Sequence, residues 1–200
     1  MELTEQQHDA LTEVLNIATA RTAAALSDLT GQRVVLDVPQ ISIHPLGDLP
    51  QVLSRFIEGD IATVHQIFNG SVAGDALLLL GHDAAVQLVD MMTEDHARSQ
   101  RLNESAREVL TEVGNILLNA CLGVFGDLLQ VHVSFSVPRL HLNDLNRMMR
   151  SVVIGREELQ YGMVVHTTFR LHASAVSGYL VVILSVSSLD RLIDAIEQFG

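Results

Sequence analysis

Two carboxylate–amide pairs at matching spacing are the residues of this sequence best suited to chemistry at a surface. Glu13 precedes Asn16 in the first half of the chain, and Glu112 precedes Asn115 at the same spacing in the second half. An ionised carboxylate accepts hydrogen bonds and attracts cations, whereas an amide both donates and accepts. Residues three apart on a helix lie on the same face, so each pair could engage a single polar partner.

A helical interpretation of the surrounding segments places these pairs on exposed ridges. At about 100° per residue, the apolar residues of segments 5–29 and 103–129 gather on one side of each helix, opposite the carboxylates. The ridges extend one turn towards the N-terminus through Asp9 and Glu108. The side chains expected to face the core are Leu11, Val14, Leu15, Ala18, Thr22, Ala25 and Leu26, and then Leu110, Val113, Leu117, Cys121, Val124 and Phe125.

Solvation is the ordinary reason for acidic residues on a helix face, and it competes with a functional interpretation here. Glu5, Asp9 and Glu13 follow one another at four-residue spacing, and the second segment repeats this arrangement. Like charges at this spacing destabilise a helix by roughly a few tenths of a kcal/mol per pair. An asparagine in mid-helix costs about half a kcal/mol relative to alanine. Because both segments keep these costs, a functional interpretation of the ridges is favoured, and shared ancestry of the two segments stays open as a partial explanation.

The two ridges belong to a repeat, because a shift of 99 residues aligns the two halves of the chain. Residues 12–14 and 111–113 are both Thr-Glu-Val, and the Val-Pro pair at 38–39 falls on the Val-Pro pair at 137–138. Two copies of about 100 residues cannot stack as a solenoid, so an ancient duplication is indicated. The predicted single domain spans residues 1–200, with pseudo-repeats 1–99 and 100–200 that meet in the polar linker 93–102.

The same order of periodicities in each half predicts an α+β fold. After the helix comes an alternating strand, then two longer strand-like runs and a closing amphipathic segment. Asn69-Gly70 is a favourable tight-turn pair between the first two long runs. We predict an antiparallel sheet built from both halves with pseudo-twofold symmetry and covered by the two long helices. The alternating strands are expected at 34–38 and 133–137, the longer runs at 60–68, 73–81, 157–171 and 176–185, and the closing segments at 82–92 and 187–199.

The composition excludes several classes of protein. A formal net charge of −12 argues against a nucleic acid or an anionic membrane surface as partner, because both require a clustered basic face. All 12 basic residues are arginine, which excludes Schiff-base chemistry and a P-loop. The apolar runs 76–80 and 179–184 are too short to insert into a membrane, and residues 1–5 carry no export signal, so we expect a cytoplasmic protein. The histidines show no zinc-binding spacing, and neither a metal site nor a bound cofactor is predicted.

In its spacing, the first ridge resembles the signature of the CheC/CheX/FliY family of chemotaxis phosphatases. That signature reads Asp or Ser, three residues, Glu, two residues, Asn, 22 residues and Pro. Asp9, Glu13, Asn16 and Pro39 fit it completely.

The second ridge resembles the same signature with one conservative departure. Glu112, Asn115 and Pro138 keep the spacing, and Glu108 stands where Asp or Ser is usual. A single Glu-x-x-Asn is common by chance, whereas two with the same distant proline are not. The length, the duplication and the order of elements resemble the two-site CheC branch over the whole chain.

The resemblance implies a hydrolase that acts on phosphorylated CheY, a response regulator of two-component signalling. Each ridge would dock into the regulator's active site, where the aspartyl phosphate and its Mg2+ are already bound. The asparagine would hold the attacking water in line, and the glutamate would pair with a basic group and orient the helix. The roles implied are Asn16 and Asn115 for the water, Glu13 and Glu112 for orientation, Asp9 and Glu108 for an extended contact, and Pro39 and Pro138 for structure.

Two questions stay open at this point. The family usually has glycine before the asparagine, as at Gly114, but Leu15 stands there in the first ridge, and Thr19 and Arg21 add bulk. Spacing thus favours the first ridge, and local crowding favours the second. The chain could also be a non-catalytic adaptor that binds a response regulator or a CheD-like receptor deamidase, which the resemblance implies as another partner.

Overall fold

Helices and strands follow one another in the same order in both halves of the chain, apart from a 3-10 turn described in the first half. The computed structural model describes residues 3–70, 72–93, 102–130, 132–153, 159–171 and 174–199. The predicted boundary between the pseudo-repeats, at residues 99 and 100, lies outside the described residues. The first half comprises α1 (Glu5–Thr30), β1 (Val34–Leu36), β2 (Gln40–Pro45), the 3-10 turn η1 (Leu46–Asp48), α2 (Leu49–Leu53), β3 (Asp60–Gly70), β4 (Gly74–Gly81) and α3 (His82–Met92). The second half comprises α4 (Glu104–Leu129), β5 (Val133–Phe135), β6 (Arg139–Asp144), α5 (Leu145–Val153), β7 (Leu159–Leu171), β8 (Ser174–Ser185) and α6 (Val186–Phe199).

Local sequence signals fix the ends of the two long helices. Thr4 caps α1 in a capping box, in which its hydroxyl accepts from the Gln7 N–H and the Gln7 side chain accepts from the Thr4 N–H. Gly31 ends α1 in the left-handed conformation, with φ of 66°. Asn103 caps α4 by accepting a hydrogen bond from the Ala106 N–H at 2.8 Å. Both predicted long helices are therefore confirmed.

The described strands form one antiparallel sheet in the order β1-β7-β8-β4-β3-β5. The short strands pair across the two halves. β1 and β2 pair with β7, whereas β5 and β6 pair with β3. β4 and β8 pair with each other at the centre. The predicted antiparallel sheet from both halves is thus confirmed.

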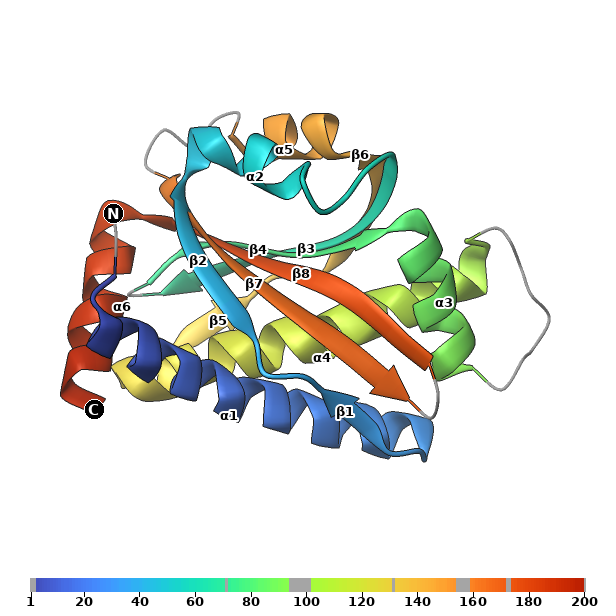
Figure 1. Cartoon of the computed structure of the whole chain (residues 1–200), viewed down its shortest axis with the longest axis horizontal. Helices are drawn as coiled ribbons and strands as arrows, with labels where there is room; N and C mark the ends of the chain where they lie inside the picture. The colour runs from blue at the N-terminus through green and yellow to red at the C-terminus, as the bar shows by residue number, and fades with distance from the viewer. Residues whose placement is uncertain are drawn as a thin grey trace.

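Helices cover both faces of the curled sheet (Figure 1). α1 and α4 lie side by side across one face, with α3 and α6 at the two ends of this layer, and α2 and α5 lie on the opposite face. The larger core cluster lies under α1 and α4 and includes Leu11, Leu110 and Phe169. The smaller cluster lies under α2 and α5 and includes Leu49 and Met149. The sheet therefore holds the long helices by their apolar faces, which leaves their polar ridges outward.

α4 is more apolar than α1. Among the described helices, it has a segment, Glu104–Asp127, that is long and apolar enough to cross a membrane. In the fold, 56% of the relevant window is buried, and all six core residues predicted on this helix are buried. α4 therefore has the burial of a core helix.

The turn predicted at Asn69-Gly70 is wrong. Both residues belong to β3, where Asn69 pairs with Ser134 and Gly70 pairs with Val133 of β5. Because β5 comes from the other half of the chain, the local sequence could not indicate this extension of the strand. Gly70 has a φ of 150°, and a Cβ atom there would lie 2.5 Å from the His132 carbonyl oxygen. Both features require glycine.

The alternation predicted to continue through Val38 and Val137 stops earlier. β1 and β5 end before these residues, which are 69% and 81% exposed. The next residues are Pro39 and Pro138, and a proline has no N–H with which to continue a strand ladder. The chain therefore leaves the first strand pairing before each proline and turns both valines to solvent.

Ala25 was expected in the core and is exposed. In the last turns of α1 the buried side shifts towards β1, where Leu26 is fully buried and the Ser27 hydroxyl accepts a hydrogen bond from the Val34 N–H at 2.9 Å. This shift in packing turns Ala25 outward.

Candidate functional site

The first ridge lies along the outer side of α1. Asp9 and Glu13 are exposed, and Asn16 is half-buried. The Thr19 hydroxyl donates to the backbone oxygen of Asn16 at 3.0 Å. Within the described residues, the side-chain amide of Asn16 has no hydrogen-bond partner. The ridge therefore presents two carboxylates and an uncommitted amide.

The second ridge lies in the same way along α4. Glu108 and Glu112 are exposed, and Asn115 is half-buried. Its amide is already engaged, because Asn119 Nδ2 donates to Asn115 Oδ1 at 2.9 Å. The structure thus places each predicted carboxylate–amide set on one helix face, with the asparagine deepest.

Different packing lies beneath the two asparagines. Leu15, which precedes Asn16, is fully buried in the core. The expectation that this side chain crowds the first ridge is therefore wrong. Gly114, which precedes Asn115, lies against β3, where a Cβ atom built on the glycine would be 2.6 Å from Val64 Cβ. Gly114 therefore permits a close approach of α4 to the sheet.

Thr19 and Arg21 also leave the first ridge open. Thr19 is buried, and Arg21 turns to α4, where its Nη1 donates to Asp127 Oδ2 at 2.8 Å. Both partners of this ion pair are largely exposed, so it contributes about 0–1 kcal/mol to stability. Local crowding consequently gives no reason to prefer the second ridge.

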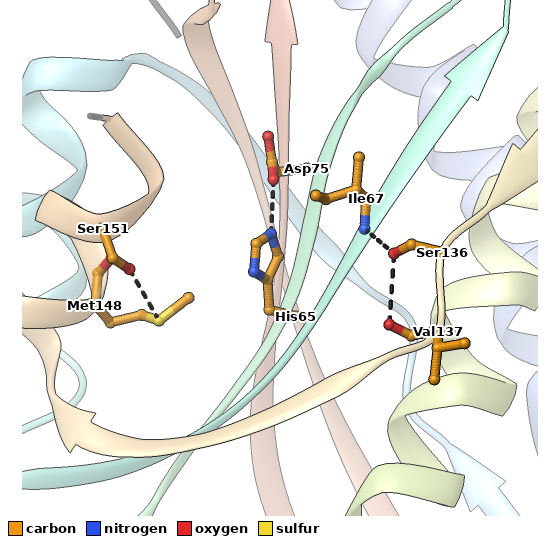
Figure 2. A network of polar contacts seen from close by, with 7 residues as sticks. All are labelled: His65, Ile67, Asp75, Ser136, Val137, Met148 and Ser151. Atoms are coloured by element: carbon orange, nitrogen blue, oxygen red, sulfur yellow. Dashed lines mark hydrogen bonds and ion pairs between the residues drawn. The ribbon is translucent and has the colours of Figure 1, made fainter. Parts of the chain in front are cut away.

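The loop before Pro138 is held against β3. The Ser136 N–H donates to the Ile67 carbonyl at 2.9 Å. The Ser136 hydroxyl accepts from the Ile67 N–H at 2.9 Å (Figure 2). Gln66 Nε2 donates to the Ser136 carbonyl at 2.9 Å. These bonds fix the backbone that leads into the proline.

The loop before Pro39 is held against β7 by Asp37. Arg170 donates to both carboxylate oxygens of Asp37, at 2.8 and 2.7 Å. The Asp37 N–H donates to the Thr168 carbonyl at 3.0 Å, and the Thr167 hydroxyl donates to the Asp37 carbonyl at 3.1 Å. The hydrogen bond from Arg170, together with its charge, lowers the pKa of the Asp37 carboxyl. The two proline loops are thus fixed by different residues at equivalent places.

A histidine–carboxylate pair lies on the other face of the sheet. His65 and Val64 point to opposite faces of β3, and Val64 is the residue that packs against α4. His65 Nε2 lies 2.6 Å from Asp75 Oδ1 (Figure 2), and the His65 ring centroid is 6.1 Å from that of His141. Burial lowers the pKa of His141, with smaller effects from His65 and Arg139. Within the described part of the chain, no group of three or more His, Cys, Asp or Glu could hold a metal ion.

Cys121 belongs to the core, as predicted. Its side chain is buried, and burial raises the pKa of the thiol to about 12. At neutral pH the sulfur is therefore protonated, and it is not a nucleophile.

Asn119 is the polar neighbour of the candidate site that the sequence analysis did not identify. It stands one helical turn after Asn115, a spacing at which side chains touch. Its Oδ1 is buried and has no hydrogen-bond partner among the described residues. The four-residue spacing was the available signal, but distance and burial are needed to recognise the contact.

Comparison with known proteins adds a relative that matches over almost the whole chain. No model of a known protein family matches the sequence. The CheY-P phosphatase CheC of Bacillus subtilis (strain 168) is 22% identical over 206 residues, which cover 96% of this chain and 94% of the relative.

Solved structures share the fold over the whole chain. FliY of Thermotoga maritima superposes with a TM-score of 0.79 at 19% identity and covers 100% of both chains. A chain of the FliG–FliM complex from H. pylori superposes with a TM-score of 0.69 at 8% identity, covering 96% of this chain and 100% of that one. At these identities the likeness establishes the mixed α+β fold with its curled antiparallel sheet.

Proposed function

We propose that the chain is a phosphatase of a phosphorylated CheY-type response regulator in chemotaxis. Its sequence and fold support membership of the CheC/CheX/FliY family. The observation that carries the proposal is the pair of outward ridges, each with a carboxylate and an amide on a long helix that is anchored by its apolar face. The B. subtilis relative is named as a phosphatase of CheY-P and matches almost the whole chain.

The proposed reaction is hydrolysis of an aspartyl phosphate. The oxygen of a water molecule bonds to phosphorus while the bond from phosphorus to the aspartyl oxygen breaks, giving a free carboxylate, inorganic phosphate and a proton. Such a transfer requires an in-line nucleophile and neutralised charge. Asn16 or Asn115 holds the water, because an amide donates and accepts without adding charge beside the phosphoryl oxygens. Mg2+ is the ion bound in the regulator's active site, and the neutralising lysine also belongs to the regulator, since this chain has no lysine.

The carboxylates orient the helix on the regulator. Glu13 and Glu112 pair with a basic group beside the phosphate, and Asp9 and Glu108 extend the contact by one turn. All four are exposed, so they can reach a partner without a change in the fold. Acidic ridges on a chain of net charge −12 also favour a basic rim on the partner.

Steady-state kinetics separates the two roles. With increasing phosphorylated regulator and Mg2+, replacing both asparagines by alanine is expected to abolish kcat while binding of the activated regulator is kept. Glu13→Gln with Glu112→Gln is expected to raise KM and to weaken its dependence on salt. Equal loss of binding in both double variants would remove the distinction between water positioning and docking.

A non-catalytic adaptor is the second candidate. The same fold occurs in a FliG–FliM complex, and Glu108 departs from the Asp or Ser of the family signature. Such a chain would bind a response regulator, or a CheD-like deamidase, and act by occupancy. Binding of the phosphorylated regulator without faster decay would select this function. Either partner implies a cytoplasmic location.

A further inference from the structure

Asn115 and Asn119 form a hydrogen-bonded amide pair on α4. Asn119 Nδ2 donates to Asn115 Oδ1 at 2.9 Å. At the matching position of α1 stands Ala20, and the Asn16 amide has no partner within the described residues. The two ridges therefore differ in how their asparagine is held.

We propose that Asn119 is a positioning residue that fixes the carboxamide of Asn115 for hydrolysis, which makes the second ridge the faster of the two. This inference rests on the proposed phosphatase function. With one lone pair of Oδ1 held by Asn119, the Asn115 Nδ2 group and the second lone pair of Oδ1 are left for the water and the phosphoryl group.

The physical basis is the ordering of a side chain before docking. An asparagine without a partner, as Asn16 is among the described residues, can adopt several rotamers, and only some of them aim the amide at the water. A hydrogen bond within the helix removes most of these alternatives, so less freedom is lost when the transition state forms. The effect acts on kcat, because Asn119 contacts Asn115 and is not required to contact the regulator.

A contribution to the stability of the fold does not explain why residue 119 is an asparagine. Its Oδ1 is buried without a partner in the described part of the chain, and such an oxygen destabilises the folded state. Asparagine is also a poorer helix former than alanine. Asn119→Ala is therefore expected to leave the thermal unfolding midpoint unchanged or higher while activity falls.

The test uses the full chain with a phosphorylated CheY-type regulator and Mg2+, in an Asn16→Ala background that leaves only the second ridge. There, Asn119→Ala is expected to lower kcat roughly three- to tenfold with KM unchanged. Asn119→Gln keeps the donor and is expected to recover part of this loss. In the reciprocal Asn115→Ala background, Ala20→Asn is expected to raise the kcat of the first ridge.

Several results would overturn the inference. An unchanged kcat in Asn119→Ala, or a loss confined to KM, removes the positioning role and leaves the phosphatase function intact. A native chain that does not accelerate decay of the phosphorylated regulator would overturn both the positioning role and the phosphatase function. The side-chain amide NMR signal of Asn115 gives a readout independent of turnover, because its order parameter is expected to fall in Asn119→Ala. An order parameter equal to that of the native chain would contradict the hydrogen bond itself.

Discussion

Gly114 of α4 lies directly against Val64 of β3. A Cβ atom on the glycine would be 2.6 Å from Val64 Cβ and Cγ1 and 2.8 Å from Cγ2, closer than side-chain atoms pack. Because Asn115 is the next residue, this contact sets how deeply the second ridge sits over the sheet.

Gly114→Ala is expected to destabilise the fold by about 1–3 kcal/mol, because the methyl group forces α4 away from β3. The matched control is Gly123→Ala in the same helix, where a Cβ atom meets nothing within 4 Å. That variant is expected to gain about 0.5–1 kcal/mol from helix propensity. Urea unfolding measures both, and equal stability of the two variants would contradict the close approach at Val64.

Cys121 is expected to be inert in the folded chain, because its thiol is buried and its pKa is raised to about 12. A coloured disulfide reagent at pH 8 should label it only as fast as the protein unfolds, and immediately in concentrated urea. Rapid labelling in native buffer would place the cysteine outside the core.

His141 is expected to weaken the fold in mild acid. Burial holds its pKa below the ordinary value of 6.5, so the unfolded chain takes up a proton at a higher pH than the folded chain does. The contribution of neutral His141 to the free energy of unfolding is therefore present above about pH 6.5, and it is lost as the pH drops towards the pKa of the folded chain. His141→Gln should therefore lose less stability than the native chain between pH 8 and pH 5.5 in urea unfolding. An identical pH dependence of the two proteins would contradict this.

The long helices and long strands could be predicted from the sequence because their periodicity is local. The polar ridges followed from the same periodicity, since a helix with one apolar stripe must turn its other side outward. The short elements β2, α2, β6 and α5 were not predicted. β2 and β6 are stabilised by pairing with the other half of the chain, and no local pattern reports that pairing.

The details around the site depend on distances that spacing does not give. Leu15 and Gly114 occupy matching positions, yet the leucine side chain packs in the core, whereas the glycine allows β3 to approach α4 closely. Val38 and Val137 continue the strand alternation in sequence, yet both are exposed because a proline follows. Asn119 was missed because the same residue type at the same spacing can equally point to water.

The most direct test of the central claim is the first-order decay of a phosphorylated CheY-type regulator with Mg2+, with and without this chain. The native chain is expected to accelerate decay. Asn16→Ala with Asn115→Ala is expected to restore the rate of the regulator alone while circular dichroism and binding stay native. Acceleration by the double variant equal to that of the native chain would contradict the role of the two amides. A native chain that binds the regulator without accelerating decay would contradict phosphatase activity itself.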